Sequence, residues 1–255
     1  MYKLFLDIGN SYLKWASVID GDYQCFEPLV MTEVLKDELA AFKAQGVPDE
    51  VYISNVGKAD AVDALKLLIQ EQFQVFPIVL STQKQCCGLV NGYDDFSQLG
   101  VDRWFAMQGA LGIYKEPCLI IDAGTALTID AVIESQHKGG FIVPGLATMR
   151  QSLSLSTADL ADYSERAISE DNESPFEGLA TNTHSAILGG TLYMTAAFLN
   201  QLIVDLNAQF ATQFKLVLTG GEAVQFGNLL DYDFDYVPDL VLQGMVNVEE
   251  SVKKV

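Results

Sequence analysis

Two short apolar runs along the chain each end in an aspartate that is followed, two residues later, by a glycine. The first run leads into Asp7–Gly9 and the second into Asp122–Gly124. Continuous apolar runs of this length predict strands that are covered on both faces of a sheet. The two Asp-x-Gly turns lie nearly half of the 255-residue chain apart. The pattern therefore predicts a duplicated fold in which each half carries one copy of the turn.

The first half alternates between strand and helix patterns. Residues 2–31 predict a three-stranded meander that turns at Asp20–Asp22, and a helix is expected to start with Thr32 as its cap and to end at Gly46. The remaining elements of this half are a strand at 51–56, an amphipathic helix at 61–73, a strand at 75–80, a loop at 81–99 and a helix from 101 to about 114.

The second half repeats this kind of order. Its expected elements are strands at 117–122 and 126–132, a turn at 135–140 that carries His137, a strand at 141–143, a helix from Leu146, a polar segment at 154–184, a helix at 184–210, strands at 215–218 and 234–237, and a helix at 239–253. Strands and helices that follow one another in this way predict an α/β protein with mixed sheets. We expect two domains, at 1–115 and 116–255.

Charge and composition narrow the class of protein. The formal net charge is −19, which argues against nucleic acid or an anionic membrane surface as a partner, because such binding requires clustered Lys and Arg. Any bound polyphosphate would need cations to offset repulsion. Two histidines are too few for a His-rich metal site, and four cysteines without a C-x-x-C spacing favour a reduced compartment. Without a signal peptide or an apolar run of spanning length, the cytoplasm is the expected location.

The first Asp-x-Gly turn carries the side chains of a phosphate site. Asp7 is expected at a strand tip, where its carboxylate stays solvated or holds a cation, and Gly9 is expected to turn the backbone with a positive φ. Asn10 and Ser11 add hydrogen-bond donors beside free backbone N–H groups, and Lys14 adds a positive charge. The turn therefore predicts a phosphate cradle, although an ordinary hairpin turn is the alternative for either copy alone.

Two further places carry candidate chemistry. Thr219–Glu222 is a third strand end that opens into glycines before a helix, where an anion or a ribose could rest on N–H groups. Asp102 is expected in the first turn of a helix, where the macrodipole favours its ionised form. From the residues alone, Asp102 is either a plain helix cap or a catalytic carboxylate.

Five motifs, in order along nearly the whole chain, together resemble type III pantothenate kinase. They are Asp7–Lys14, Gly92–Tyr93 with Leu99–Trp104, Asp122–Ala126, Gly139–Gly145 and Thr219–Gly221. The resemblance implies the fold of the actin, sugar kinase and Hsp70 superfamily, with two duplicated ribonuclease H-like domains facing across a nucleotide cleft. It also implies ATP-dependent phosphorylation of pantothenate to 4'-phosphopantothenate, the first step of coenzyme A biosynthesis, and a homodimer.

The resemblance implies a role for each matched residue. The first phosphate loop would consist of Asp7, Ile8, Gly9, Asn10, Ser11, Tyr12, Leu13 and Lys14, with Asp7 near Mg²⁺. Thr125 would bind ATP, and Asp122 would hold a monovalent cation, K⁺ or NH₄⁺. Asp102 would be the general base that deprotonates the primary hydroxyl of pantothenate. The pantothenate contacts would be Tyr93, Gly100, Val101, Asp102, Arg103 and Thr183.

Two positions depart from the family pattern, and two other functions stay open. Phe96 stands where a Pro is usual, and Glu222 stands where an Asp is usual. One alternative is a phosphotransferase of the same superfamily that acts on another small alcohol. The other is a nucleotide-dependent regulatory protein, since some relatives were first described as Bvg accessory factors.

Overall fold

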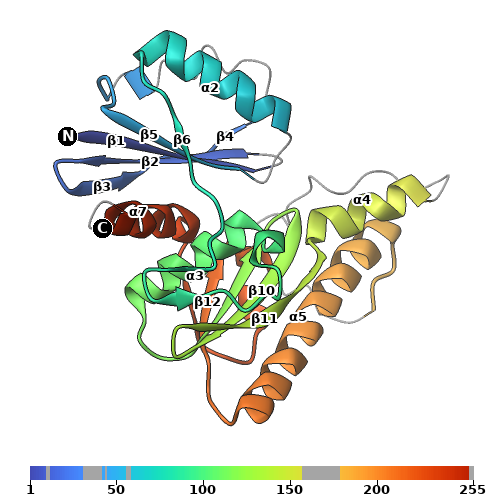
Figure 1. Ribbon diagram of the computed structural model, residues 1–255. Coiled ribbons are helices and arrows are strands. Elements are labelled where there is room, and N and C mark those ends of the chain that lie inside the picture. The colour runs from blue at the N-terminus through green and yellow to red at the C-terminus, as the bar shows by residue number, and fades with distance from the viewer. Residues whose placement is uncertain (10–11, 31–41, 44, 56–58, 157–178, 253–255) are drawn as a thin grey trace. The chain divides into compact units, whose positions relative to one another are not determined.

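The computed structural model describes residues 1–255 except 10–11, 31–41, 44, 56–58, 157–178 and 253–255 (Figure 1). The chain forms two compact units. The first contains Met1–Tyr114, Ser135–His137 and Asp239–Val255, and the second contains Lys115–Glu134 and Lys138–Pro238. The chain thus leaves the first unit after Tyr114 and returns to it for the C-terminal helix.

The first unit is built on a sheet whose central strand is the first strand of the chain. Strand β1 (Tyr2–Ile8) pairs antiparallel with β2 (Tyr12–Ile19) and parallel with β5 (Glu50–Asn55). The sheet order is β3-β2-β1-β5-β6, and β4 also pairs with β2; the outer strands are β3 (Asp22–Cys25), β4 (Leu29–Val30) and β6 (Ile78–Val79).

Both faces of this sheet are covered within the first unit, which explains the continuous apolar pattern of β1. Helix α2 (Ala59–Phe73) packs its apolar side on one face, in a core that includes Leu4, Leu6 and Ile53. Helix α7 (Leu240–Val252) lies against the opposite face (Figure 1). There Tyr52 of β5 stacks on Phe5 and donates a hydrogen bond from its hydroxyl to Glu249, which also accepts one from Lys3 at 2.6 Å.

The rest of the first unit consists of a hairpin, a short helix and a long helix. Strands β7 (Gln85–Cys86) and β8 (Leu89–Val90) form the hairpin, followed by the 3₁₀ helix η1 (Phe96–Gln98) and helix α3 (Val101–Ile113). Helix α3 packs closely along α7. A Cβ at Gly244 would lie 1.8 Å from the carbonyl oxygen of Phe105, so only glycine permits this contact.

The second unit repeats the strand arrangement of the first. Strand β9 (Cys118–Ala123) pairs antiparallel with β10 (Ala126–Ile133) and parallel with β12 (Lys215–Thr219). The sheet order is β13-β12-β9-β10-β11-β8-β7; it begins with β13 (Phe234–Tyr236), and the start of β11 (Gln136–Pro144) pairs with β8. Helices α4 (Leu146–Ser156) and α5 (Thr183–Phe210) and the short α6 (Ala223–Phe226) and η2 (Gly227–Leu229) complete the unit.

The predicted α/β class and most of the predicted elements are confirmed, with three corrections. Residues 75–80 contain only the two-residue strand β6, and the loop expected at 81–99 contains the β7–β8 hairpin. The turn expected at 135–140 lies earlier, because Glu134 and Ser135 both adopt a positive φ, so His137 is on a strand. The helix expected from Thr32 lies mostly outside the described residues, apart from the buried Phe42.

One helix bears on the expectation that no segment spans a membrane. By length and composition alone, α5 could cross a bilayer. Eight of its residues are buried, and Leu192, Leu199 and Ile203 belong to the core of the second unit. The core helix of a folded domain can be equally long and apolar. The buried residues of α5 form the apolar face that such a core helix needs.

Candidate functional site

The first Asp-x-Gly turn joins β1 to β2. Asp7 lies opposite Lys14 of β2 and beside Ser54 of β5. The expected solvated position of Asp7 is wrong: the residue is only 6 % exposed. Asp7 is therefore a buried carboxyl group whose strand partner carries a lysine at the opposite position.

The backbone of this turn differs from the expected one. The N–H of Gly9 donates to the carbonyl of Tyr12 at 3.0 Å, and the predicted positive φ of Gly9 is wrong. Glycine is favoured here by close approach instead, since a Cβ would lie 3.1 Å from the Tyr12 oxygen. Tyr12 is exposed and Leu13 is buried, while Asn10 and Ser11 lie outside the described residues.

The second Asp-x-Gly turn has the same strand environment. Asp122 lies opposite Thr128 of β10 and beside Thr219 of β12, and it is partly exposed. Gly124 closes the turn by donating its N–H to the carbonyl of Ala126 at 3.0 Å. Thr125 is exposed at the tip of the turn. The predicted duplication of the turn is thus seen in matching strand pairs.

The third glycine-marked strand end touches the second turn directly. Gly220 has a φ of +86°, and a Cβ there would lie 2.3 Å from the Ala123 carbonyl and 2.5 Å from Asp122 Oδ1. Gly145, just before α4, donates its N–H to the Thr125 carbonyl at 3.0 Å. These glycines let three backbone segments of the second unit meet around Asp122 and Thr125.

Glu222 fixes one of these segments to another. Its carboxylate accepts hydrogen bonds from the N–H groups of Leu146 at 2.7 Å and Ala147 at 2.9 Å, the first residues of α4. Its own N–H donates to the Ala123 carbonyl at 3.0 Å. The carboxylate therefore caps α4 and lies where its helix dipole favours negative charge. The sequence named Glu222 as part of a glycine-marked strand end and as a departure from the family pattern, and did not predict this cap.

The motif at Gly100–Arg103 opens helix α3, as predicted. Gly100 is the N-cap, and Oδ1 of Asp102 accepts a hydrogen bond from the N–H of Arg103 at 2.8 Å. A Cβ at Gly100 would lie 2.6 Å from that oxygen, so glycine makes room for the carboxylate. Val101 and Asp102 are both partly exposed. Asp102 thus stands at a helix N-terminus with access to solvent.

Tyr93 is held between a cation and an imidazole. The Nη1 of Arg103 donates to the Tyr93 hydroxyl at 2.7 Å, and the guanidinium carbon lies 5.5 Å from the ring centroid. The ring of His137 is stacked on that of Tyr93, with centroids 5.8 Å apart. Arg103 is 4 % exposed and His137 is 3 % exposed. Tyr93 and Arg103, which the sequence assigned to the same substrate motif, are therefore in direct contact.

His137 was not predicted as part of this site. The backbone of His137 lies directly against Gly92, the residue before Tyr93. A Cβ at Gly92 would lie 2.0 Å from the His137 carbonyl oxygen. A lone histidine in a polar segment gives no sequence signal for this contact. Phe96 is exposed and lies in η1, while the Asn91 amide donates to its carbonyl at 3.3 Å. The substitution of the usual Pro thus places an aromatic ring on the surface of the loop.

Thr183 is the first residue of α5. It follows the N-cap Asn182, whose side chain accepts from the N–H of Ser185 at 2.8 Å, and it is exposed. It lines a pocket of about 640 Å³ with residues of α4 and α5. Thr183, Asp122 and Thr125 belong to the second unit, whereas residues 7–14, Tyr93 and Gly100–Arg103 belong to the first.

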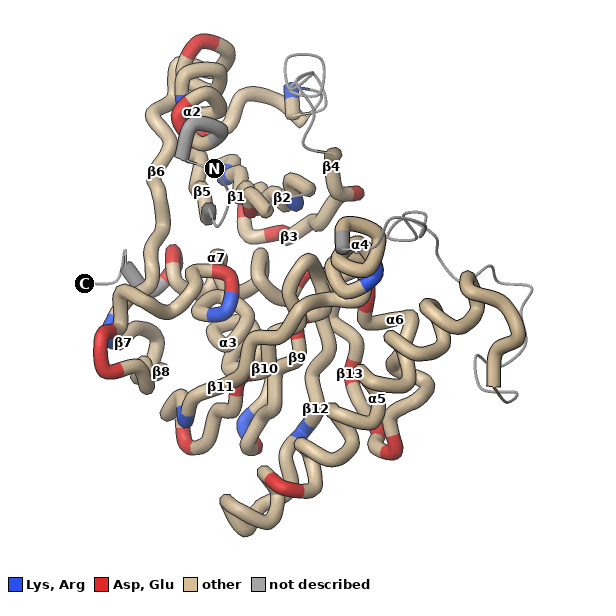
Figure 2. The backbone as a smooth tube through the Cα atoms, turned by 90° about the vertical axis from the view of Figure 1, so that its right-hand side faces the viewer, with Lys and Arg blue, Asp and Glu red and all other residues tan. Residues whose placement is uncertain are grey.

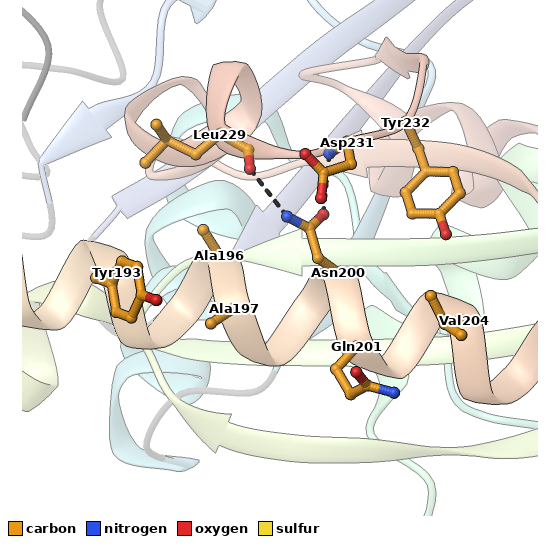
Figure 3. Close-up of a pocket in the computed structure, with 9 residues that line it drawn as sticks. All are labelled: Tyr193, Ala196, Ala197, Asn200, Gln201, Val204, Leu229, Asp231 and Tyr232. Atoms are coloured by element: carbon orange, nitrogen blue, oxygen red, sulfur yellow. Dashed lines mark hydrogen bonds between the residues drawn. The ribbon is translucent and has the colours of Figure 1, made fainter. Parts of the chain in front are cut away.

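A second groove, of about 420 Å³, lies on α5 and contains none of the predicted site residues (Figure 3). Asn200 faces the segment after α6: its Nδ2 donates to the Leu229 carbonyl at 3.1 Å, and its Oδ1 accepts from the N–H of Asp231 at 3.0 Å. Tyr193 and Val204 border the groove and are exposed. Most of α5 is uncharged (Figure 2).

The described residues contain no group of three or more His, Cys, Asp or Glu side chains that could enclose a metal ion. Mg²⁺ is usually bound through one or two carboxylates, with phosphate oxygens and waters as its other ligands. The buried carboxylate of Asp7 is a group of the kind that such an ion takes. Asp122 is a second, partly exposed carboxylate, and Gly220 approaches it so closely that a Cβ there would lie 2.5 Å from its Oδ1.

Known proteins similar to this chain share both its sequence and its fold. A family model described as Type III pantothenate kinase matches residues 3–205. A Type III pantothenate kinase of Hydrogenovibrio crunogenus is 42 % identical over 252 residues, which cover 98 % of this chain and 99 % of the relative.

Solved structures agree on the fold. A Baf family protein of Campylobacter jejuni is 23 % identical, with a TM-score of 0.61 and coverage of 99 % of this chain and 100 % of the other. A Listeria monocytogenes protein assigned as an N-acetylmannosamine kinase has a TM-score of 0.52 at 12 % identity, covering 100 % of this chain and 99 % of that one. The fold is that of duplicated actin-like ATPase domains, as predicted.

Proposed function

The chain belongs to the type III pantothenate kinase family, and from this premise we propose that Asp102 is the general base of its reaction. The activity of the family is the ATP-dependent phosphorylation of pantothenate in coenzyme A biosynthesis, and this is the activity of the chain. The pantothenate hydroxyl must lose a proton as it attacks the γ-phosphate of ATP. A positioned carboxylate serves this purpose in other kinases.

The observation that carries the proposal is the position of Asp102 at the start of α3. The helix N-terminus stabilises its ionised form, the hydrogen bond from the N–H of Arg103 orients its carboxylate, and the residue has access to solvent. Its neighbour Arg103 holds Tyr93 through a hydrogen bond and a cation–π contact. Tyr93, Gly100, Val101 and Arg103 would then bind pantothenate beside the base, with Thr183 as a further contact.

The two Asp-x-Gly turns would bind the nucleotide. Residues 7–14 would hold the phosphates, with Lys14 opposite Asp7 offsetting the charge of the γ-phosphate, and Thr125 would contact ATP from the second unit. Asp7 would be a ligand of Mg²⁺, and Asp122 a ligand of a monovalent cation, K⁺ or NH₄⁺. Bound cations of this kind neutralise charge on the triphosphate.

The proposed base is tested by Asp102→Asn, which conserves size and removes the basic carboxylate. Turnover is expected to fall by about 10²-fold to 10⁴-fold, the usual contribution of general-base catalysis. ATP binding is expected to be unchanged. Pantothenate-dependent ATP consumption, measured with and without K⁺, provides the rate, and calorimetry provides the ATP affinity. Asp63→Asn on the surface of α2 is the control. A normal kcat in the Asp102 variant would refute the role.

We also propose that the active form is a cytoplasmic homodimer that pairs through α5. Tyr193, Met194 and Val204 expose large apolar surfaces on this helix, and small residues of α5 beside the groove in Figure 3 permit close approach. Val204→Glu would place a charge in that interface, and light scattering should then detect a monomer. A dimer of unchanged stability in this variant would place the interface elsewhere.

A further inference from the structure

Two adjacent cysteines in the first unit have no role in the reaction. Cys86 ends β7, and Cys87 is the first residue of the two-residue turn that leads into β8. Their sulfur atoms lie 3.3 Å apart. Cys87 is exposed and Cys86 is partly exposed, so both thiols can be reached from solvent.

The hairpin presents this pair in an unusual conformation. Cys87 and Gly88 both have a positive φ, of 52° and 89°, which is the pattern of a type I′ turn. Such turns favour Asn, Asp or Gly at the first position, because other side chains are strained there. The hairpin is fixed from outside: the Gln108 amide donates to the Cys86 carbonyl at 3.0 Å, and the Cys87 thiol donates to the Asn247 carbonyl at 3.5 Å.

The sulfur separation indicates which chemistry fits the pair. Adjacent Cα atoms are about 3.8 Å apart across a trans peptide, below the usual range for a disulfide, so a direct bond between these sulfurs would be strained. With element–sulfur bonds of roughly 2.3 Å, a linear two-coordinate ion needs sulfurs about 4.6 Å apart, whereas a centre that binds two sulfurs near a right angle needs about 3.3 Å. The observed distance matches the second geometry.

We propose that Cys86 and Cys87 form a dithiol site that captures one trivalent arsenic centre, and that capture weakens pantothenate binding. An organoarsenous acid with two hydroxyl groups reacts with both thiols. Two As–S bonds form and two As–O bonds break, and each thiol proton leaves with a hydroxyl as water. No atom is oxidised or reduced. The expectation for pantothenate rests on the substrate loop assigned under the proposed function.

Burial and the neighbouring thiol raise the pKa of Cys86 to about 11, so this thiol carries at neutral pH the proton that leaves as water in the condensation.

The hairpin is continuous with the loop that carries Tyr93. Asn91, one residue after β8, donates its N–H to the Lys84 carbonyl at 3.0 Å and its amide to the Gln83 carbonyl at 3.3 Å. The same side chain accepts from the N–H of Tyr93 at 3.0 Å. A change in the twist of the hairpin is thus transmitted through one asparagine to the tyrosine that contacts Arg103.

The test is titration of the full-length protein with phenylarsine oxide, followed by intact mass spectrometry. One phenylarsenic adduct per chain is expected in the wild type and in Cys25→Ser, which removes another exposed thiol as a control. Cys86→Ser and Cys87→Ser should each abolish the adduct. A dithiol such as 2,3-dimercaptopropanol should remove it, whereas an equal thiol concentration of a monothiol should not.

Two outcomes would overturn the site. One is an adduct that persists in either serine variant; the other is wild-type peptide mapping in which iodoacetamide still alkylates Cys86 and Cys87 after arsenical treatment. The mapping does not depend on how the variants fold. The coupling is tested separately: the pantothenate KM of the adduct should rise about tenfold, since small misplacements of substrate contacts are costly. An unchanged KM at full occupancy, with the kinase otherwise active, would overturn the coupling while leaving the proposed function intact.

Discussion

The two Asp-x-Gly turns have the same backbone plan and different chemical surroundings. In each, a central strand ends beside an antiparallel and a parallel neighbour, and the aspartate occupies the same register position. Asp7 is buried opposite Lys14, whereas Asp122 is partly exposed opposite Thr128. The duplicated fold thus places a lysine opposite the aspartate of one turn and a threonine opposite that of the other.

The second turn is also more crowded by backbone than the first. A Cβ at Gly220 would collide with the Ala123 carbonyl and one at Gly145 with the Gly124 carbonyl, and Glu222 caps α4 at the same place. A lysine beside a carboxylate suits a metal-bound phosphate, since the two charges hold the metal and the phosphate respectively. Carbonyl and carboxylate oxygens without a neighbouring lysine suit a monovalent cation. The following predictions test this difference between the turns.

The largest difference is expected from removal of the two aspartates. Asp7→Asn should lower kcat by about 10²-fold or more, the scale seen when one electrostatic stabiliser of a transition state is lost. Asp122→Asn should retain more activity and shift the dependence on K⁺ instead. Steady-state rates over Mg²⁺ and K⁺ concentration series distinguish the two. Equal losses, with no change in K⁺ dependence, would mean that the turns do not divide the cations between them.

The next largest effect is expected on the free energy of unfolding, when glycines near the second turn are replaced. Gly220→Ala is expected to cost about 3 kcal/mol, the sum of left-handed backbone strain and overpacking against the Ala123 carbonyl. Gly124→Ala is the matched control: its nearest contact would be 3.9 Å away, so a change within about 0.5 kcal/mol is expected. Urea unfolding measures both. Similar midpoints for the two variants would show that the contact at Gly220 is not tight.

The charge at the first turn should affect nucleotide binding. Lys14→Met keeps much of the aliphatic stem and removes the ammonium, and the KM for ATP should rise about tenfold, equivalent to about 1.4 kcal/mol. Thr128→Val at the matching position of the second turn is the control, and its KM for ATP should change little. A larger effect at Thr128 than at Lys14 would assign the phosphates to the other turn.

The smallest effect is expected at Glu222, which caps α4 beside the second turn. Among the described residues, the first turn has no such cap. Glu222→Gln keeps the length of the side chain and removes the charge that α4 favours at its N-terminus, so stability should fall by about 1 kcal/mol. Thermal unfolding measures the shift, with Glu71→Gln on α2 as a surface control. An unchanged midpoint would mean that Leu146 and Ala147 find other acceptors.

The sequence determined the α/β class, the duplicated turns and the candidate residues, because these depend on local periodicity and short motifs. Asp102 could be placed at a helix N-terminus from Gly100 and the apolar pattern that follows. His137 could not be placed, since its position depends on where two positive-φ residues end β10 and on its contact with Gly92. The burial of Asp7 was also missed, because it depends on what the folded chain packs over the sheet, and Asp122 is partly exposed at the same register position.

Tertiary structure alone decided how these residues are used. Only folding brings Glu222 to the first turn of α4, and only folding stacks His137 on Tyr93. The C-terminal helix packs against the first sheet rather than within the second unit, which no local pattern specifies. Local sequence fixes which elements form, whereas the partners of a side chain depend on contacts between residues far apart in the chain, and these are set by packing.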